Sequence, residues 1–118
     1  EDNGTIPKPL VRTALSGCTG MDVIALLRKN KIEPEDLQIN VAGELSKEAP
    51  IAYTAIHLDY IFKGKETDKE QALQAVTLSQ EKFCGVSSML KKIMPVTWNV
   101  IYNNMLIFTN KEKQLVSV

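Results

Sequence analysis

The feature that constrains this chain most is an apolar helical pattern over residues 10–27. Pro7 and Pro9 come just before it, and proline suits the first turn of a helix, where a missing N–H costs nothing. Within residues 21–27 the single polar side chain is Asp22. A helix that is apolar on nearly every side is buried on most sides, so we expect it at the centre of the fold or of a dimer.

Composition narrows the class of protein. The chain has 118 residues, with 14 basic and 14 acidic side chains and a net charge of zero. We expect one globular domain over residues 1–118, because a chain of this size buries a core without disulfides or metal. Charge balance argues against binding nucleic acid or an anionic membrane, since both normally need an excess of Lys and Arg. The longest uninterrupted apolar run, residues 23–27, is far below the ~18–20 residues of a membrane span, so we expect a soluble, cytoplasmic protein.

Two segments after the helix have the alternation of half-buried strands. In residues 37–45 the apolar positions alternate with polar ones, and Gly43 predicts a bulge or a close approach by another segment. In residues 53–63 one face is expected to carry Thr54, Ile56, Leu58, Tyr60 and Phe62. We expect the two strands to pair as an antiparallel hairpin around residues 46–50.

A helix pair is predicted next. Residues 67–70 have the form of a capping box, which opens a helix through residues 72–78. Residues 86–93 predict a second, short amphipathic helix with Val86, Met89, Leu90 and Ile93 on its apolar face. Lys91 and Lys92 fall on the expected solvent side of this helix.

The end of the chain returns to the strand pattern. Residues 96–102 alternate as a strand, Asn103–Asn104 resembles a turn, and residues 105–108 and 115–118 predict one or two further strands. Trp98 is expected in the sheet core or in a dimer interface. The architecture predicted from the pattern is α+β: a helix, a hairpin, a helix pair and then strands again.

The chain has two cysteines, Cys18 and Cys84. No CxxC occurs, and the single His57 has no second histidine or cysteine at metal-ligand spacing, so we predict no metal and no cofactor. In a reducing cytosol the residue type alone favours two buried thiols that act as small hydrophobes. Cys84 lies at the expected junction of two helices, where free N–H groups and Lys82 would lower its pKa. Asp22, one turn after Cys18, would oppose a negative charge on that sulfur.

Two other patterns have structural explanations. Ser16–Gly20 is a run of small residues inside a bulky helix, and its glycines cost roughly 1 kcal/mol each relative to alanine. They favour the close approach of another helix or a ligand. His57 and Asp59 share a strand face, but a catalytic dyad needs a nucleophile beside it and none is near in the sequence, so we expect a solvated face.

Two separated motifs give the chain a resemblance to a known family. The first is Leu-Ser-Gly-Cys-Thr-Gly-Met-Asp-Val-Ile at residues 15–24, around Cys18. The second is Leu-Ser-Gln-Glu-Lys-Phe-Cys-Gly-Val-Ser-Ser-Met-Leu-Lys at residues 78–91, around Cys84. Between them, residues 53–64 read Tyr-x-x-Ile-x-Leu-x-Tyr-x-Phe-x-Gly. In this order and spacing the chain resembles the OsmC/Ohr family, the osmotically inducible protein C and organic hydroperoxide resistance proteins.

The resemblance implies an intertwined homodimer of α+β fold, with a long central Cys-bearing helix and a second helix pair on an antiparallel sheet. It also implies a thiol-dependent peroxidase. In the family the first cysteine, here Cys18, attacks an organic hydroperoxide and becomes a sulfenic acid. The second, here Cys84, resolves it as a disulfide, which a dithiol reductant then reduces. This cycle needs a thiolate held by a cation and two Cα atoms within ~7 Å, but no metal, haem or flavin.

The chain departs from the family pattern before Cys18. Where the family usually has Pro and then Glu, residues 7–10 read Pro-Lys-Pro-Leu, without a carboxylate. The family's activating Arg comes from an N-terminal β-region that we expect this chain to lack, whether by truncation, by replacement from another chain or by genuine absence. Arg12 and Arg28 lie about 120° and 80° around the helix from Cys18, so any cation must come from tertiary or dimer packing. These departures support a second hypothesis, a non-catalytic OsmC-like dimeric binding or structural domain.

Overall fold

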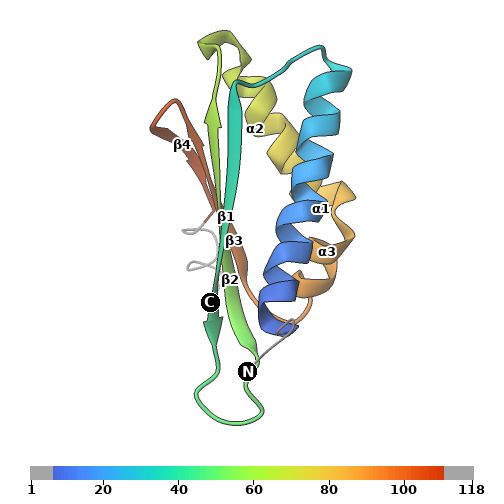
Figure 1. Ribbon diagram of the computed structural model, residues 1–118, viewed down its shortest axis with the longest axis vertical. Coiled ribbons are helices and arrows are strands. Elements are labelled where there is room, and N and C mark those ends of the chain that lie inside the picture. The colour runs from blue at the N-terminus through green and yellow to red at the C-terminus, as the bar shows by residue number, and fades with distance from the viewer. Residues whose placement is uncertain (1–6, 111–118) are drawn as a thin grey trace.

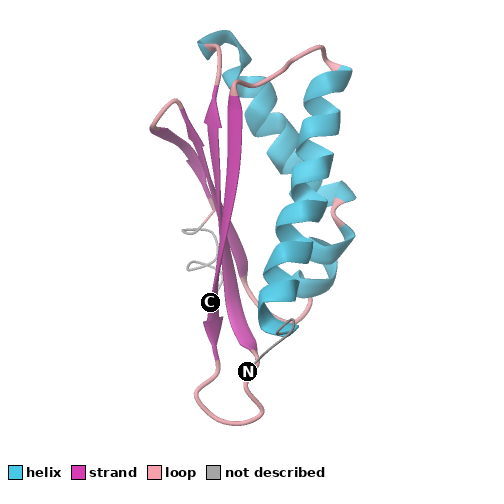
Figure 2. Ribbon diagram, viewed as in Figure 1, coloured by secondary structure: helices cyan, strands magenta, loops and turns pink. Residues whose placement is uncertain are grey.

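The computed structural model describes residues 7–110, which form two layers. One layer is a four-stranded sheet in the order β1-β2-β3-β4. The helices form the other layer and lie on the same face of the sheet (Figures 1 and 2), which confirms the α+β class. In chain order the elements are α1 (Pro7–Lys29), β1 (Asp36–Leu45), β2 (Tyr53–Lys63), η1 (Glu66–Asp68), α2 (Lys69–Leu78), η2 (Ser79–Phe83), α3 (Gly85–Lys91), β3 (Val96–Tyr102) and β4 (Met105–Thr109).

The predicted hairpin is confirmed. β1 and β2 pair antiparallel, with Leu37 opposite Phe62 and Val41 opposite Leu58. Four of the five residues expected on the inner face of β2 are buried, while Thr54, near the start of the strand, is exposed. The alternation therefore places the helix-facing side of β2 correctly over most of its length.

The sheet is mixed, whereas an antiparallel sheet was expected. β2 and β3 run parallel, since the chain between them crosses over through α2 and α3. β3 and β4 are antiparallel, and the predicted turn joins them through Asn103 and Asn104, with φ of 50° and 68°. This left-handed pair is the geometry that a tight hairpin turn requires. The strand predicted over residues 115–118 lies outside the described residues.

Gly43 is a point of close approach, as predicted. A Cβ atom at this position would collide with the ring of Tyr53 from the neighbouring strand. The register irregularity of the β1–β2 ladder lies next to it, between Glu44 and Leu45. Glycine is therefore required here by the ring that covers it.

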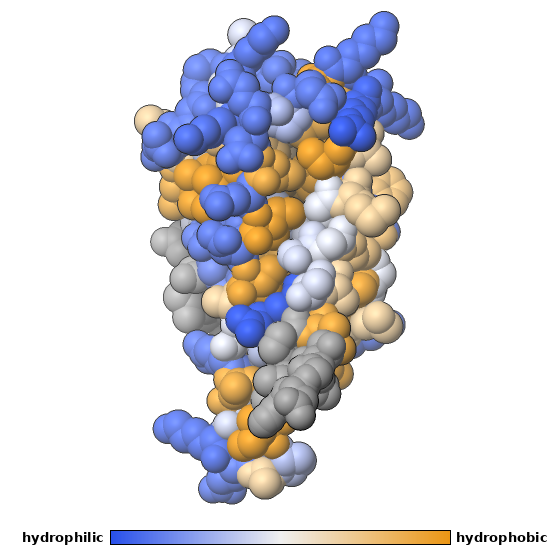
Figure 3. Space-filling model, viewed as in Figure 1, coloured by the Kyte–Doolittle hydropathy of each residue, from blue (hydrophilic) through white to orange (hydrophobic). Residues whose placement is uncertain are grey.

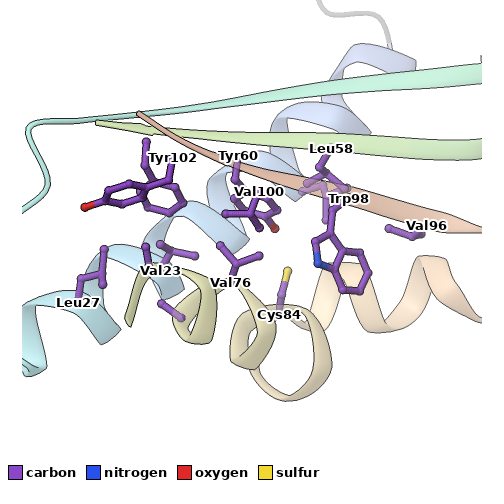
Figure 4. Packing of buried hydrophobic residues seen from close by; sticks show 14 of the residues in the cluster. Val23, Leu27, Leu58, Tyr60, Val76, Cys84, Val96, Trp98, Val100 and Tyr102 are labelled. Atoms are coloured by element: carbon purple, nitrogen blue, oxygen red, sulfur yellow. The ribbon is translucent and has the colours of Figure 1, made fainter. Parts of the chain in front are cut away.

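The hydrophobic core lies between the helices and the two central strands. Figure 4 shows side chains from α1, α2 and the strands meeting in this layer, with Cys84 among them. Trp98 is 6% exposed, which confirms its placement in the sheet core. The buried apolar residues are Leu15, Val23, Leu27, Ile56, Leu58, Tyr60, Phe62, Ala72, Ala75, Val76, Cys84, Val96, Trp98, Val100 and Tyr102.

α1 is less buried than the apolar pattern predicts. Met21 is 76% exposed, and Leu10 is half exposed. The segment Leu10–Lys29 is long and apolar enough to cross a membrane by length and composition, a test that the core helix of a soluble protein also passes, and 22% of its most apolar window is buried. The longest uninterrupted run, residues 23–27, did not reveal this length, because Asp22 ends the run although most residues before it are also apolar or small. Among the residues that the structure describes, the outer side of α1 is an exposed apolar face.

The two short helices begin differently from the prediction. α2 starts at Lys69 after the 3-10 turn η1, and the residue at its N-cap, Asp68, makes no side-chain capping hydrogen bond. In α3 the expected apolar face is wrong in part, since Met89 is exposed and Ile93 lies beyond the end of the helix with 75% of its surface exposed. Ser87 is buried in their place because the inner side of α3 contacts a polar cluster.

The close packing around Gly64 predicts a specific stability defect. A Cβ at Gly64 would lie 2.7 Å from the hydroxyl of Tyr102, which is itself held by a 2.6 Å hydrogen bond to the Lys65 carbonyl. We expect Gly64→Ala to lower the free energy of unfolding by roughly 1–3 kcal/mol, as overpacking does. Urea denaturation measures this, with Gly85→Ala as the control because nothing lies within 4 Å of its Cβ position. Equal stability of the two variants would contradict the packing described here.

Candidate active site

The fold brings the two cysteines together. The Sγ atoms of Cys18 and Cys84 and a carboxylate oxygen of Asp22 all lie within 4.8 Å of one another. Both thiols are free. Cys84 is 2% exposed, whereas Cys18 and Asp22 are half-buried. The sequence spacing could not show this three-residue cluster, since it joins α1 to the start of α3.

Local structure explains how each sulfur reaches this point. Cys18 and Asp22 are four residues apart on α1, so they lie on one side of the helix. α2 runs into the π-helical turn η2, and Cys84 then adopts an extended conformation with φ −83° and ψ 104°. This residue caps α3, where its sulfur accepts a hydrogen bond from the Ser87 N–H at 3.4 Å. In Figure 4 the Cys84 sulfur points toward the strands.

A chain of buried hydrogen bonds crosses the helix–sheet boundary beside the sulfurs. The Ser79 hydroxyl donates to Asp22 Oδ2 at 3.0 Å. Thr19 Oγ1 lies 2.7 Å from Ser79 Oγ and 2.7 Å from the Tyr60 hydroxyl. Gln80 Nε2 donates to the same Tyr60 hydroxyl at 2.6 Å. These contacts connect η2, α1 and β2 inside the core.

The direction of every bond in this chain follows from its two ends. The Asp22 oxygen at one end accepts, the Gln80 amide NH₂ at the other end only donates, and each hydroxyl has one proton to give. Ser79 gives its proton to Asp22, so it must accept from Thr19, and Thr19 in turn accepts from Tyr60. Tyr60 accepts from Gln80. All the donors point toward Asp22, and such aligned bonds polarise one another.

Tyr60 is held in its protonated form. Burial raises its pKa to about 12, although hydrogen bonds to Thr19 and Gln80 act in the opposite direction. The hydrogen-bond chain requires Tyr60 to be a neutral phenol, because a phenolate could not donate a hydrogen bond to Thr19.

Lys91 is the cation that the sequence pattern misplaced. It was expected on the solvent side of its helix, but its Nζ donates to the Gln80 carbonyl at 2.5 Å and lies 4.8 Å from the Trp98 ring centroid. Burial lowers the pKa of Lys91, while attraction to Glu81 and Cys84 acts in the opposite direction. The structure thus supplies a positive charge to the surroundings of Cys84 through tertiary packing.

One sequence signal could have found this contact. Ser87 and Lys91 lie one helical turn apart on α3, and both reach Gln80. The Ser87 hydroxyl donates to Gln80 Oε1 at 2.5 Å, while Lys91 bonds the main chain of the same residue. A serine and a lysine at this spacing predict a polar strip, which the apolar-face assignment overlooked.

The expected lowering of the Cys84 pKa is wrong. Burial and then a hydrogen bond with Cys18 raise the pKa of Cys84 to about 11. The N–H groups of Ser87 and Val86 act in the lowering direction, as predicted, but burial outweighs them. Lys82 is exposed. Cys84 is therefore a thiol at neutral pH, and it lies beside a second sulfur.

The remaining candidates lie elsewhere. His57 contacts Thr97 Oγ1 at 2.7 Å through Nδ1 and Asp59 Oδ1 at 3.1 Å through Nε2, so a hydroxyl absent from the local sequence does meet this pair. The alternation of β2 places His57 and Asp59 on the sheet face opposite the helices, away from the cysteines. Arg28 pairs with Glu33 at 3.5 Å in an exposed position. Within residues 7–110, the buried Nε of Arg12 has no hydrogen-bond partner.

The fold and the paired cysteines define a two-layer α+β protein with one thiol on its longest helix and a second at a helix junction. A family model described as OsmC-like protein matches residues 1–99. The chain belongs to the OsmC-like protein family.

Individual relatives agree with this assignment. Protein YhfA of Escherichia coli strain K12 is 33% identical over 96 residues, which cover 81% of this chain and 72% of that protein. A hypothetical protein from Aquifex aeolicus VF5 has a similar structure, with a TM-score of 0.73, 29% identity, and coverage of 86% of this chain and 78% of that one. An organic hydroperoxide resistance protein OsmC from Legionella pneumophila shares the fold, with a TM-score of 0.65, 19% identity, and coverage of 85% and 72%.

The raised pKa of Cys84 predicts how its alkylation depends on pH. We expect the rate at Cys84 in the folded protein to rise about tenfold per pH unit between about pH 7 and 10, because the thiolate fraction does so below a pKa of about 11. Peptide mapping after pulses of isotope-coded iodoacetamide measures this rate. The urea-unfolded chain is the control and should level off above its ordinary value of ~8.5. A plateau near pH 8 in the folded protein would contradict the burial of this thiol.

Proposed function

We propose that this protein is a thiol-dependent peroxidase that reduces organic hydroperoxides through Cys18 and Cys84. The observation that carries the proposal is that two free sulfurs, each on a different helix, lie within 4.8 Å of each other. A disulfide needs sulfurs ~2.05 Å apart, so side-chain rotation has only a short distance to close. Membership of the OsmC-like family supports the same chemistry, and the Legionella protein that shares the fold is an organic hydroperoxide resistance protein.

In the first step the Cys18 thiolate attacks one oxygen of the hydroperoxide. The O–O bond breaks, Cys18 is oxidised to a sulfenic acid, and the alkoxide leaves and takes a proton from solvent to become an alcohol. Cys18 suits this step because it lies half-buried on α1, whereas Cys84 is buried in the core. The substrate therefore meets Cys18 first.

In the second step the Cys84 sulfur attacks the Cys18 sulfur. The S–O bond breaks, and the departing hydroxide takes the Cys84 proton and leaves as water. A dithiol donor of a reducing cytoplasm then reduces the disulfide by two thiol exchanges and is itself oxidised. No metal or organic cofactor takes part in this cycle.

The two sulfurs are not equivalent, and their difference supports the assigned roles. The hydrogen bond with Cys18 is one of the causes that keep Cys84 protonated. A protonated Cys84 can donate a hydrogen bond to the Cys18 sulfur. Lys91 adds a positive charge that interacts with Cys84, and its ammonium is held by the Gln80 carbonyl and the Trp98 ring.

The peroxidase proposal predicts the behaviour of three variants. With cumene hydroperoxide and a dithiol, Cys18→Ser should lose turnover, while Cys84→Ser should accumulate a sulfenic acid that a dimedone probe traps at Cys18. Lys91→Met should slow turnover several-fold through loss of the nearby charge. Lys92→Met is its matched control, since Lys92 is exposed, and should match the parent. Equal background rates in the parent and in both cysteine variants would contradict the peroxidase and leave the non-catalytic binding domain.

We propose that the working protein is a homodimer in which the outer side of α1 packs on its copy. Five exposed residues form a stripe spaced four, three, four and four positions apart: Leu10, Ala14, Gly17, Met21 and Ala25. This spacing is that of a seam between two helices, and its small residues allow the backbones to approach closely. Figure 3 shows hydrophobic and near-neutral residues over the middle of the face that α1 and β1 share, with hydrophilic residues gathered at the top.

A groove that is lined in part by the stripe residues Gly17, Met21 and Ala25 supports a second copy as the occupant. It has a volume of about 760 Å³ and lies between α1 and β1, with Ile24, Leu37 and Ile39 in its lining. A partner's Met21 could enter this groove while its own groove received the same side chain, as two-fold symmetry requires.

The dimer proposal predicts a loss of assembly in one variant. Met21→Glu should give a monomeric mass in sedimentation at micromolar concentration, because it places a charge in the seam. Gln74→Glu adds the same charge on the exposed side of α2 and should sediment as a dimer like the parent. A parent chain that sediments as a monomer would contradict the proposal.

A further inference from the structure

We propose that Cys18, Asp22 and Cys84 also form a binding site for one zinc-class divalent ion, and that the bound ion withholds both thiols from peroxide. Binding of the ion rests on the structure alone. The inhibitory consequence rests on the proposed peroxidase function. The two claims are tested by different readouts below.

The geometry is close to that of a three-ligand site. In tetrahedral zinc sites the metal lies about 2.3 Å from sulfur and 2.0–2.2 Å from oxygen, which puts neighbouring ligand atoms roughly 3.6–3.8 Å apart. The two Sγ atoms and the Asp22 oxygen all lie within 4.8 Å of one another. Side-chain rotations that move the ligand atoms by about an ångström would bring these three atoms to this spacing. The fourth coordination position of the ion would be left for water. Two thiolates and a carboxylate are ligands that zinc accepts.

Neighbouring groups already orient two of the three ligands. The Ser79 hydroxyl donates to Asp22 Oδ2 at 3.0 Å, and the Ser87 N–H donates to the Cys84 sulfur at 3.4 Å. Hydrogen bonds of this kind fix the direction of ligands in metal sites and tune their affinity. Ser79 is itself held by Thr19, at the end of the buried donor chain. The support around the ligands is therefore built into the core.

Asp22 distinguishes a metal site from a simple thiol pair. A carboxylate beside two sulfurs opposes the negative charge that a nucleophilic thiol must carry. The same carboxylate favours the binding of a divalent cation, because it supplies the third ligand and further negative charge. Its position is explained better by a cation among the three residues than by peroxide chemistry alone.

Each cysteine of the cluster has a glycine as its neighbour in the sequence. Gly17 precedes Cys18 and Gly85 follows Cys84, and both glycines are exposed. Nothing lies within 4 Å of the position that a Cβ would take at either glycine. In the single chain, neither glycine adds a side chain next to the cysteine that it neighbours, although Gly17 also belongs to the proposed dimer seam.

Binding involves no oxidation or reduction. Each thiol gives one proton to solvent, two metal–sulfur bonds and one metal–oxygen bond form, and the ion exchanges bound water for these ligands. While the ion is bound, the sulfur lone pairs needed to attack the O–O bond are engaged. The disulfide and the metal complex exclude each other, because both use the same two sulfurs.

The binding claim is tested on the full, reduced chain with Co²⁺ as the spectroscopic probe and Zn²⁺ in calorimetry. We expect one ion per chain and a sulfur-to-cobalt charge-transfer band. Cys18→Ser and Cys84→Ser should each weaken that band and lower zinc affinity at least a hundredfold. Asp22→Asn should keep the sulfur band but lower affinity at least tenfold, since it removes an anionic ligand. Asp59→Asn, on the opposite face of the sheet, is the control and should bind like the parent.

Other outcomes would overturn the site. Zinc affinity that is unchanged in both cysteine variants would place the ion elsewhere, and an unchanged Asp22→Asn would remove the third ligand. Circular dichroism of each variant separates loss of ligand from loss of fold. The inhibitory claim is read from the rate of Cys18 alkylation and of cumene hydroperoxide consumption, which zinc should slow and a chelator should restore. If zinc protects Cys18 from alkylation but the metal-free chain consumes no peroxide, the site stands and the peroxidase proposal fails.

Discussion

The buried hydrogen-bond chain that ends on Asp22 is the interaction on which the site depends. It starts at the amide of Gln80, passes through the hydroxyls of Tyr60, Thr19 and Ser79, and ends at the carboxylate. Its members come from η2, β2 and α1, so it fixes the helix that carries Cys18 against the turn that leads to Cys84. An unpaired polar group at this depth would cost about 1–3 kcal/mol, so the donors hold the helix in a single position. The short distance between the Cys18 and Cys84 sulfurs follows from this placement of α1 against η2.

The same core explains the different character of the two thiols. Cys84 is covered by the core and remains protonated, with its pKa raised to about 11. Cys18 lies at the edge of the same layer, where α1 passes from its buried side to its apolar outer face. The Lys91 ammonium, held by Trp98 and the Gln80 carbonyl, adds a positive charge to the surroundings of Cys84. The Cys18 sulfur is therefore the more accessible of the two, and the Cys84 sulfur lies buried next to it.

Local patterns predicted most of the fold, because strands and the long helix are set by short-range periodicity. The hairpin, the turn at Asn103 and Asn104, and the two cysteines as candidate residues all followed from the sequence. The parallel pairing of β2 with β3 did not, since it depends on the path of a crossover. The role of Lys91 and the raised pKa of Cys84 were also missed. Both arise from burial among distant segments, which a helical wheel cannot show.

The central claim is that the fold holds Cys18 and Cys84 ready to bond to each other. It is tested most directly by equilibrating the native chain with a glutathione redox buffer and identifying the products by mass spectrometry. The account predicts an intramolecular Cys18–Cys84 disulfide as the dominant oxidised species, because a neighbouring thiol within the chain outcompetes free glutathione. A mixed disulfide of glutathione on Cys18, with Cys84 still a free thiol, would contradict it.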